Sequence, residues 1–244
     1  MVRHEVGALR ERLEAARSVC VLTGSGISAE SGLPTFRGAG GLWRSHRVEQ
    51  LASPEGFARD PLLVWTWYDE RRRAHAAAEP SPAHRALVRL EQRVPDFTLA
   101  TQNVDSLHVR AGSRNVLELH GQLREARCTA CSARAPIDRI TAKLSKHDRA
   151  CIEHDCGGIW RPDIVWFGEA LPYDVISAAF EAARRADIVL VIGTSALVQP
   201  AASIASKRNT RAYVAEINLE ETPLSAEADC SLHGRASEIV PLLA

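Results

Sequence analysis

Two short apolar runs, each followed by a turn of small and polar residues, most constrain the fold of this 244-residue chain. Residues 18–23 (SVCVLT) lead into GSGISA, and residues 186–193 (ADIVLVIG) lead into TSALVQ. Continuous runs rich in β-branched residues are typical of parallel strands that are covered on both faces. Two further strands are expected over 95–103 and 211–218. Strand, turn and helix, repeated along the chain, predict an α/β fold with a doubly wound parallel sheet and ligands at the carboxyl ends of its strands.

Helical periodicity covers segments between and beside these strands. Helices are expected over 4–17, 61–77, 82–93, 174–185 and 199–208. The third begins with Ser81 as its cap and Pro82 at the first helical position, where the missing N–H of proline costs nothing. Such helices are what a doubly wound sheet needs to cover both of its faces.

The overall charge and hydropathy argue against several classes of partner. Lysine plus arginine and aspartate plus glutamate number 30 each, so the chain lacks the basic excess of a general nucleic-acid or anionic-membrane binder. The longest apolar run, residues 188–192, is too short to span a bilayer, and the N-terminal segment lacks the apolar core of a signal peptide. We expect a cytoplasmic protein with neither a membrane nor a nucleic acid as partner, whose cysteines serve as metal ligands or in packing.

Four of the six cysteines cluster between residues about 124 and 162, where apolar periodicity is weak. They are Cys128, Cys131, Cys151 and Cys156, two close pairs separated by 19 residues. Four thiolates at such spacing suit tetrahedral structural zinc and leave no open coordination position for catalysis. The second pair is more widely spaced than usual, so His147 and His154 stay alternative ligands, and a module without metal stays the alternative to zinc. The stretch is predicted to form a small inserted module.

The segment GSGISA, residues 24–29, matches G-x-G-x-x-G/A directly after a predicted strand. Glycines in this pattern allow a tight turn and a close approach of the backbone to a pyrophosphate at a helix N-terminus. A plain strand-to-helix turn fits the same letters, so both interpretations stay open. The acidic residue that usually follows about 20 positions later, for the ribose hydroxyls, is not evident, which argues against an ordinary dehydrogenase.

Polar groups gather after another predicted strand. Residues 101–108 (TQNVDSLH) combine amide, carboxylate and imidazole groups, and His120 stands between apolar residues and before a glycine. A neutral imidazole suits proton transfer near physiological pH, but a histidine in such a place is more often structural than catalytic. From the local sequence, both interpretations of His120 stay open.

The expected helix over 61–77 contains an arginine without an intrahelical partner. Arg72 and Arg73 follow carboxylates by three or four positions, whereas Arg71 has no carboxylate within helical reach. Tyr68 lies three positions before Arg71, so the phenol and the guanidinium share a helical face. The pair is either a surface arginine beside a packed tyrosine or a site that binds a carboxylate by bidentate and phenolic hydrogen bonds.

Taken together, the motifs resemble those of the sirtuins, the NAD-dependent protein-lysine deacylases. In chain order they are GSGISAESGLPTFRG, TQNVDSLH, LHG, the two cysteine pairs, IVWFGEALP, GTSALVQPAA and INLEETP. The resemblance extends from about residue 18 to 240. It implies a single catalytic domain over 1–244, in which a Rossmann-like NAD-binding fold carries the zinc-binding module of residues about 124–162. Acyl-lysine proteins would bind in the cleft between the two parts.

The resemblance also implies which residues bind NAD. They are Gly24, Ser25, Gly26, Ile27, Ala29, Thr35, Phe36 and Arg37 after the first strand, Gln102, Asn103, Val104 and Asp105 after the second, Gly193, Thr194 and Ser195, then Asn218, Leu219 and Glu220 at the adenosine ribose, and Ala236 near the adenine. Ser25 departs from the family, which usually has alanine there. Its hydroxyl either donates to a phosphate or crowds the loop, and we expect a modest effect on NAD affinity.

In the mechanism that the resemblance implies, His120 becomes the general base that acts on a ribose hydroxyl. Asn103 would orient the ribose and a water, and Asp105 would hold the nicotinamide amide. The products would be nicotinamide, free lysine and O-acyl-ADP-ribose. The segment Val165, Trp166, Phe167, Gly168 and Glu169 resembles the one that pairs with the substrate backbone as an added strand.

Tyr68 and Arg71 match the Tyr-x-x-Arg pair of the class III sirtuins, which remove succinyl, malonyl or glutaryl groups. The resemblance therefore implies activity on acidic acyl groups in addition to acetyl groups. A protein ADP-ribosyltransferase is the alternative that uses the same cofactor, and a catalytically weak NAD-sensing module is the non-enzymatic alternative. A zinc-ribbon binder of nucleic acid fits least, because the net charge is zero.

Overall fold

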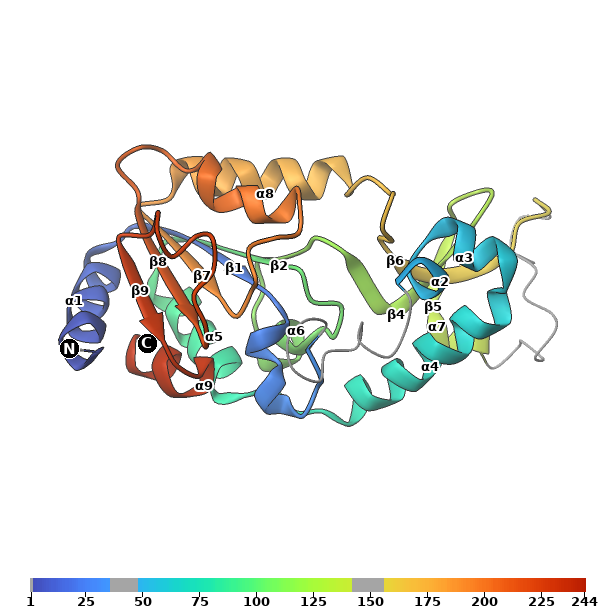
Figure 1. Ribbon diagram of the computed structural model, residues 1–244, viewed down its shortest axis with the longest axis horizontal. Coiled ribbons are helices and arrows are strands. Elements are labelled where there is room, and N and C mark those ends of the chain that lie inside the picture. Colours follow the sequence, from blue (N-terminus) through green and yellow to red (C-terminus); the bar gives the residue numbers. More distant parts are fainter. Residues whose placement is uncertain (1, 36–47, 142–155) are drawn as a thin grey trace.

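The computed structural model describes residues 2–35, 48–141 and 156–244 (Figure 1). Its larger sheet is entirely parallel, with the strand order β3-β2-β1-β7-β8-β9. The strands are β1 (Ser18–Thr23), β2 (Asp96–Thr101), β3 (Val116–Glu118), β7 (Ile188–Ile192), β8 (Tyr213–Asn218) and β9 (Cys230–His233). The direction of the strand order reverses at β1, which pairs with β2 on one side and β7 on the other. The predicted doubly wound sheet is confirmed, and β1 and β7 flank its topological switch point.

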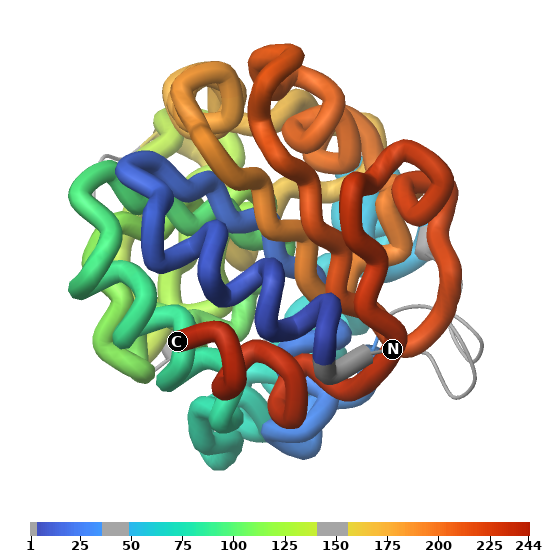
Figure 2. Tube along the Cα trace, turned by 90° about the vertical axis from the view of Figure 1, so that its left-hand side faces the viewer, coloured from blue at the N-terminus to red at the C-terminus, as the bar shows by residue number. Residues whose placement is uncertain are grey.

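Alternate residues of β1 supply two separate cores, one on each face of this sheet. Val19 and Val21 pack with α1 (Val2–Ala15), α5 (Pro82–Arg93) and α9 (Ala236–Ile239), whereas Cys20 and Leu22 pack with α8 (Tyr173–Arg185) and the 3₁₀ helix Ala201–Lys207. Figure 1 shows α8 on the opposite side of the sheet from α5 and α9. Both chain ends lie at the same end of the molecule (Figure 2). Burial on both faces explains why these strands read as continuous apolar runs.

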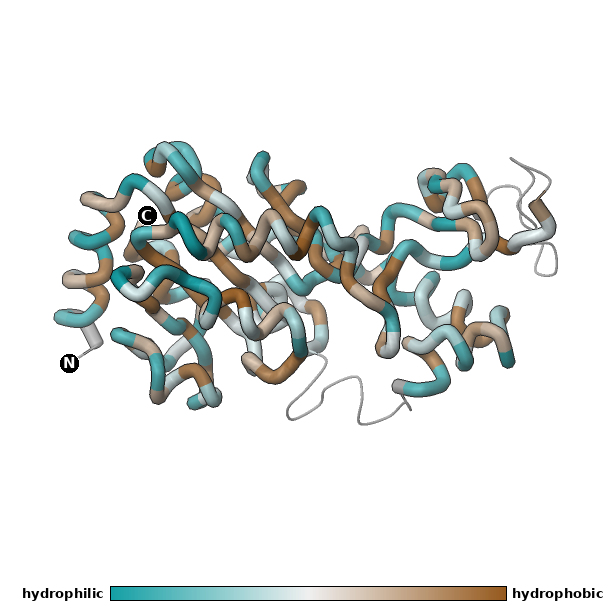
Figure 3. Tube along the Cα trace, turned by 90° about the horizontal axis from the view of Figure 1, so that it is seen from above, coloured by the Kyte–Doolittle hydropathy of each residue, from teal (hydrophilic) through white to brown (hydrophobic). Residues whose placement is uncertain are grey.

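A smaller, three-stranded antiparallel sheet occupies the other end of the long axis (Figures 1 and 3). Its strands are β5 (Arg134–Pro136), β4 (Gly121–Cys128) and β6 (Trp160–Ile164), in that order. The helices of this lobe are α2 (Val48–Leu51), α3 (Pro54–Arg59), α4 (Pro61–Ala77) and α7 (Ile137–Thr141). Trp65, Trp67 and Tyr68 of α4 share a buried core with Leu123 of β4 and Trp160 of β6. The helix that carries Arg71 is therefore anchored on the small lobe.

Most expected helices lie close to their expected limits, but the small sheet was missed by sequence reasoning. The segment expected as a helix over 199–208 is a 3₁₀ helix over Ala201–Lys207, and α6 (Leu107–Ala111) was not expected. At the start of α5 the main-chain N–H of the N-cap residue Ser81 donates to Nδ1 of His84, three positions later, at 3.1 Å. The His84 side chain therefore takes part in capping this helix. Within the described ranges, no helix is both long and apolar enough to cross a membrane.

Candidate active site

Four strands of the large sheet end at one place, and the residues that follow them contact one another. Gln102, after β2, donates through Nε2 to Oγ1 of Thr194, after β7, at 2.8 Å. Asn218, the last residue of β8, donates through Nδ2 to the main-chain oxygen of Thr194 at 2.9 Å. Since parallel strands place their carboxyl ends at one edge, segments far apart in sequence converge here.

The glycines after β1 pack directly against the end of β7. The N–H groups of Gly24 and Gly26 donate to the main-chain oxygens of Ile192 and Gly193 at 3.0 and 2.8 Å. A Cβ on Gly26 would lie 2.7 Å from Cα of Gly193, and Gly193 itself has a φ of +61°. The chain continues as 3₁₀ turns, Ser25–Ile27 and Ala29–Ser31, and so lacks the longer helix that the G-x-G-x-x-G/A pattern suggests. Gly24 and Gly26 therefore serve the strand-to-strand contact whether or not a phosphate is bound.

Asn103 is buried and holds the first loop. Its Nδ2 donates to the main-chain oxygen of Gly24 and to Oγ of Ser28, each at 3.1 Å. Ser28 donates in turn to Asp105 at 2.7 Å. Burial raises the pKa of Asp105, although bonds from the Leu107 N–H and Ser28 oppose the shift. The amide and the carboxyl group are thus fixed in position before any ligand binds.

A cavity opens between this network and α4. Its lining residues are Ser25, Ser28, Leu33, Pro34, His75, Asn103, Val104 and Asp105. Sequence reasoning missed His75, although it lies four positions after Arg71 on the same helix. Burial, followed by the charge of Arg71, lowers the pKa of His75 to about 4, so this histidine is neutral at physiological pH.

His120 immediately precedes β4 and faces the end of β2. Its Nδ1 lies 3.0 Å from the main-chain oxygen of Gln102. A carbonyl oxygen only accepts, so Nδ1 carries the proton and Nε2 holds the free lone pair. Burial lowers the pKa of His120, and the bond to Gln102 only partly opposes this. The imidazole is therefore neutral at physiological pH, in one tautomer, and able to accept a proton at Nε2.

Tyr68 and Arg71 lie together on the inner face of α4. Tyr68 is 4% exposed, and burial raises the pKa of its phenol. The Arg71 guanidinium lies 3.7 Å from the ring centroid of Trp67, and its buried Nε has no hydrogen-bond partner within the part of the chain that the structure describes. Burial lowers the pKa of Arg71 to about 10, which leaves it charged at neutral pH. Arg71 is half-buried, and a buried donor such as its Nε is costly to leave unpaired, so an anion that met it would stabilise this arrangement.

The segment 165–169 leaves β6 beside His120. The Val165 N–H donates to the main-chain oxygen of His120, and the Phe167 N–H to that of Ala52, both at 2.9 Å. Gly168 has a φ of +87°, and the Glu169 N–H donates to the main-chain oxygen of Trp166 at 3.0 Å. The segment is therefore a turn held at several points, with Phe167 45% exposed.

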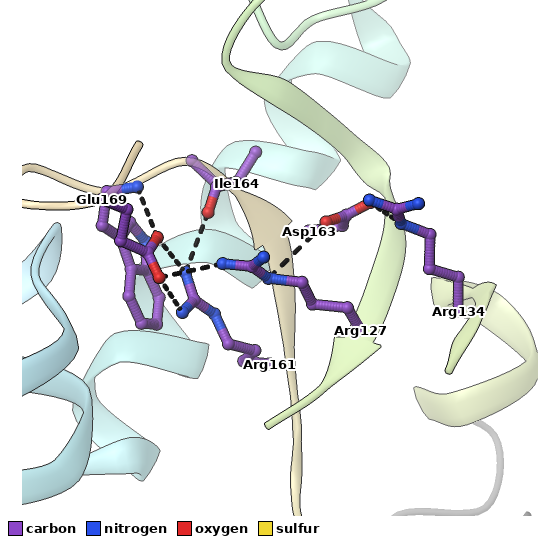
Figure 4. Close-up of polar contacts among 7 residues, drawn as sticks. Arg127, Arg134, Arg161, Asp163, Ile164 and Glu169 are labelled. Carbon is purple, nitrogen blue, oxygen red and sulfur yellow. Dashed lines mark hydrogen bonds and ion pairs between the residues drawn. The ribbon is translucent and has the colours of Figure 1, made fainter. Parts of the chain in front are cut away.

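An ion-pair network that the sequence did not reveal holds this turn (Figure 4). Arg161 binds both carboxylate oxygens of Glu169, at 2.7 and 2.8 Å, and Arg127 binds the first of them at 2.9 Å. The Trp166 N–H donates to the second oxygen at 2.8 Å. Burial favours the neutral form of Glu169, but the bonds from Arg161 and Trp166 outweigh it and lower the pKa of the carboxyl group.

Three of the four predicted zinc ligands come together in the small lobe. The sulfur atoms of Cys128, Cys131 and Cys156 all lie within 4.8 Å of one another. Burial raises the pKa of Cys128, but bonds from the Cys131 and Ala130 N–H groups outweigh it and bring the pKa to about 7. Three converging thiols, one of them acidic, fit a tetrahedral structural zinc. Cys151 lies outside the described residues, as do His147 and His154.

The remaining predicted NAD-site residues have varied surroundings. Ile27 is buried, Ala29, Thr35 and Ser195 are half-buried, Leu219 and Glu220 are exposed, and Ala236 is buried at the start of α9. Phe36 and Arg37 lie outside the described residues. The cofactor contacts of all these positions stay predictions.

Comparison with known proteins gives a consistent result. A chain from Pyrococcus furiosus, named NAD-dependent protein deacylase, is 47% identical over 242 residues, which cover 98% of this chain and 96% of that protein. A Thermus thermophilus protein of the same name is 48% identical over 239 residues, with 96% and 92% covered. The crystal structure of a Sir2 homologue–NAD complex superposes with a TM-score of 0.88 at 44% identity, over 97% of this chain and 91% of that one. A complex of Sir2, a p53 peptide and NAD⁺ superposes with a TM-score of 0.82 at 31% identity, over 94% and 93%.

The model of the Sir2 family matches residues 24–200, which run from the first glycine after β1 to the proline that precedes the 3₁₀ helix Ala201–Lys207. The chain therefore belongs to the Sir2 family, the sirtuins.

Proposed function

We propose that this chain is an NAD-dependent protein-lysine deacylase that accepts acidic acyl groups, such as succinyl and malonyl, as well as acetyl. The observation that carries the deacylase activity is the single neutral tautomer of His120, with Nε2 free and Nδ1 bound to Gln102. Relatives of 46 to 49% identity, named NAD-dependent protein deacylases over at least 90% of this chain, support it. The chain would work in the cytoplasm, where its metal-binding thiols stay reduced.

NAD would lie along the converging strand ends, with its phosphates near Gly24–Ser28 and its adenosine ribose near Asn218. When bound, it supplies a ribose carbon that accepts the acyl oxygen and nicotinamide as the leaving group. His120 would take a proton from a ribose hydroxyl at Nε2, because Nδ1 is already committed to Gln102. Asn103 would orient the ribose, and Asp105 would hold the nicotinamide amide in the cavity that both residues line. Products would be nicotinamide and O-acyl-ADP-ribose.

The acyl-lysine peptide would add a strand beside residues 165–169, which leave β6 at His120. Its side chain would pass toward α4, where Tyr68 and Arg71 share a face. The unpaired Nε of Arg71 supports recognition of a carboxylate, since a guanidinium binds that group in bidentate fashion. Zinc, bound by Cys128, Cys131 and Cys156 with a fourth ligand, would hold the small lobe that carries this face.

The test compares succinyl-lysine and acetyl-lysine forms of one peptide, with NAD, in wild-type and Arg71→Met protein. Loss of a charged hydrogen bond should lower the ratio of desuccinylation to deacetylation efficiency about 10- to 100-fold. Arg73→Met, an exposed arginine on the same helix, is the control and should leave the ratio unchanged. An equal loss of both activities in Arg71→Met would show that Arg71 has a structural role only. If an active wild type left succinyl-lysine unchanged, the chain would be a deacetylase without activity on acidic acyl groups.

The same assay separates the other functions. Transfer of ADP-ribose to a protein acceptor without release of free lysine would identify a transferase. Binding of NAD without release of nicotinamide would identify a non-enzymatic NAD-binding module.

A further inference from the structure

The hydroxyl oxygen of Tyr68 accepts a hydrogen bond from the side chain of Trp166. Nε1 of Trp166 lies 2.9 Å from the Tyr68 oxygen, and both side chains are buried. An indole N–H only donates, so the phenolic oxygen must accept this bond. The Tyr68 proton must then point elsewhere. Among the described residues, Tyr68 has no acceptor for it.

This phenol stays protonated, since burial raises the pKa of Tyr68. It therefore presents one O–H donor, three positions before the unpaired Nε of Arg71. These two unsatisfied donors share one face of α4 and are complementary to an anionic acceptor, not to a methyl group. If Trp166 did not donate, the phenol could turn its proton away and offer a lone pair instead.

Contacts with neighbouring residues fix the orientation of the Trp166 side chain. The Arg161 guanidinium lies 3.3 Å from the Trp166 ring centroid, and the ring centroids of Phe57 and Trp166 are 5.2 Å apart. Glu169 is paired with Arg161 (Figure 4) and accepts the main-chain N–H of Trp166 at 2.8 Å. The ring and the main chain of Trp166 are thus fixed by one ion pair.

We propose that Trp166 is a positioning residue for acyl specificity: its indole N–H commits the Tyr68 oxygen as an acceptor and so aims the Tyr68 proton at the carboxylate of an acidic acyl group. This inference rests on the proposed activity toward acidic acyl-lysine. It assigns to the indole of Trp166 a role separate from any pairing of its main chain with the peptide.

The experiment is a double-mutant cycle on the ratio of desuccinylation to deacetylation efficiency. Trp166→Phe should lower this ratio about fivefold, the loss expected for one neutral hydrogen bond. In a Tyr68→Phe background the same substitution should change the ratio no further. Trp65→Phe is the matched control, because it also removes a buried indole donor, to the main-chain oxygen of Trp160 at 3.0 Å, without touching the Tyr68 hydroxyl.

An unchanged ratio in Trp166→Phe, or an equal fall with and without the Tyr68 hydroxyl, would overturn the inference and leave Trp166 as a packing residue. Failure of the proposed function has a different signature, namely a wild type that deacetylates but ignores succinyl-lysine. If Trp166→Phe does not fold, the indole ¹⁵N–¹H resonance of Trp166 is followed in wild type. It should move further downfield with succinyl-lysine than with acetyl-lysine peptide, since a phenol that donates accepts more strongly. Equal shifts would overturn the inference.

Discussion

Nδ1 of His120 and the main-chain oxygen of Gln102 lie 3.0 Å apart, and this one bond joins the start of the small sheet to the end of β2 in the large one. It settles the tautomer of the imidazole without any ligand. The same bond determines how activity depends on pH.

Burial lowers the pKa of His120 below the ordinary histidine value of about 6.5, so the base should be neutral at and above that pH. Activity needs the neutral form, so kcat/KM should be constant near pH 7 and fall tenfold per pH unit well below the lowered pKa. The pH profile of kcat/KM between pH 5 and pH 8 measures this. An acid limb centred above pH 7 would contradict it.

Gly193→Ala should destabilise the fold. The Gly193 φ is +61°, and a Cβ there would lie 2.6 Å from the Ile27 nitrogen. Strain and the clash should together lower the free energy of unfolding by about 2–4 kcal/mol, measured by urea denaturation. Gly7→Ala is the control, since nothing lies within 4 Å of a Cβ there and Gly7 is inside α1. It should instead raise the free energy by about 0.5–1 kcal/mol, and equal effects of the two would refute the packing role of Gly193.

Glu169→Gln should reduce stability in a pH-dependent way. Despite burial, bonds from Arg161 and the Trp166 N–H lower the pKa of Glu169 below the ordinary glutamate value of 4.5, so its contribution is present above pH 4.5 and lost as the pH falls through the lowered pKa. At pH 7 the variant should lose about 1.5–3 kcal/mol, because Arg161 keeps a buried charge with a weaker partner. The difference from wild type should shrink below pH 4.5 in thermal unfolding. Glu14→Gln, at an exposed pair on α1, should change stability by no more than about 0.5 kcal/mol. A loss at Glu169 that does not shrink at all as the pH falls would argue against the ion pair.

Metal analysis should find one zinc per chain, and Cys128→Ala should abolish it. The sulfur atoms of Cys128, Cys131 and Cys156 converge within 4.8 Å, so losing one leaves an incomplete set. Protease should then cut the small lobe while the parallel sheet keeps its amide protection. Cys20→Ala is the control, because Cys20 is buried in β1 and burial raises its pKa to about 12. Zinc retained in Cys128→Ala would remove that residue from the site.

The parallel sheet was predictable because its strands are local signals. In β1 and β7 every residue after the first of β1 is buried, which gives an unbroken apolar run. Helix α4 has its expected limits because the Asp60 side chain accepts from the Leu63 N–H and Pro61 follows the cap.

The small sheet was not predictable in the same way. Strand β4 lacks a regular alternation, since its buried residues Leu123, Ala126 and Cys128 are unevenly spaced, and its register with β6 shifts between Gly121 and Ala126. Arg161 would read as a surface residue in sequence, yet it is 6% exposed because Glu169 neutralises it across a turn. The bond from Trp166 to Tyr68 spans 98 positions, and no local pattern marks such a contact.

The place of β1 between β2 and β7 has a consequence for synthesis. When the ribosome has made β1 and β2, the partner for the other edge of β1 lies 87 residues ahead, between Thr101 and Ile188. At bacterial or eukaryotic elongation rates that interval lasts on the order of ten seconds. During it, the unpaired backbone edge of a strand that is buried in the finished sheet stays available to other chains. That edge is therefore the part of the nascent sheet most open to pairing with another chain until β7 emerges.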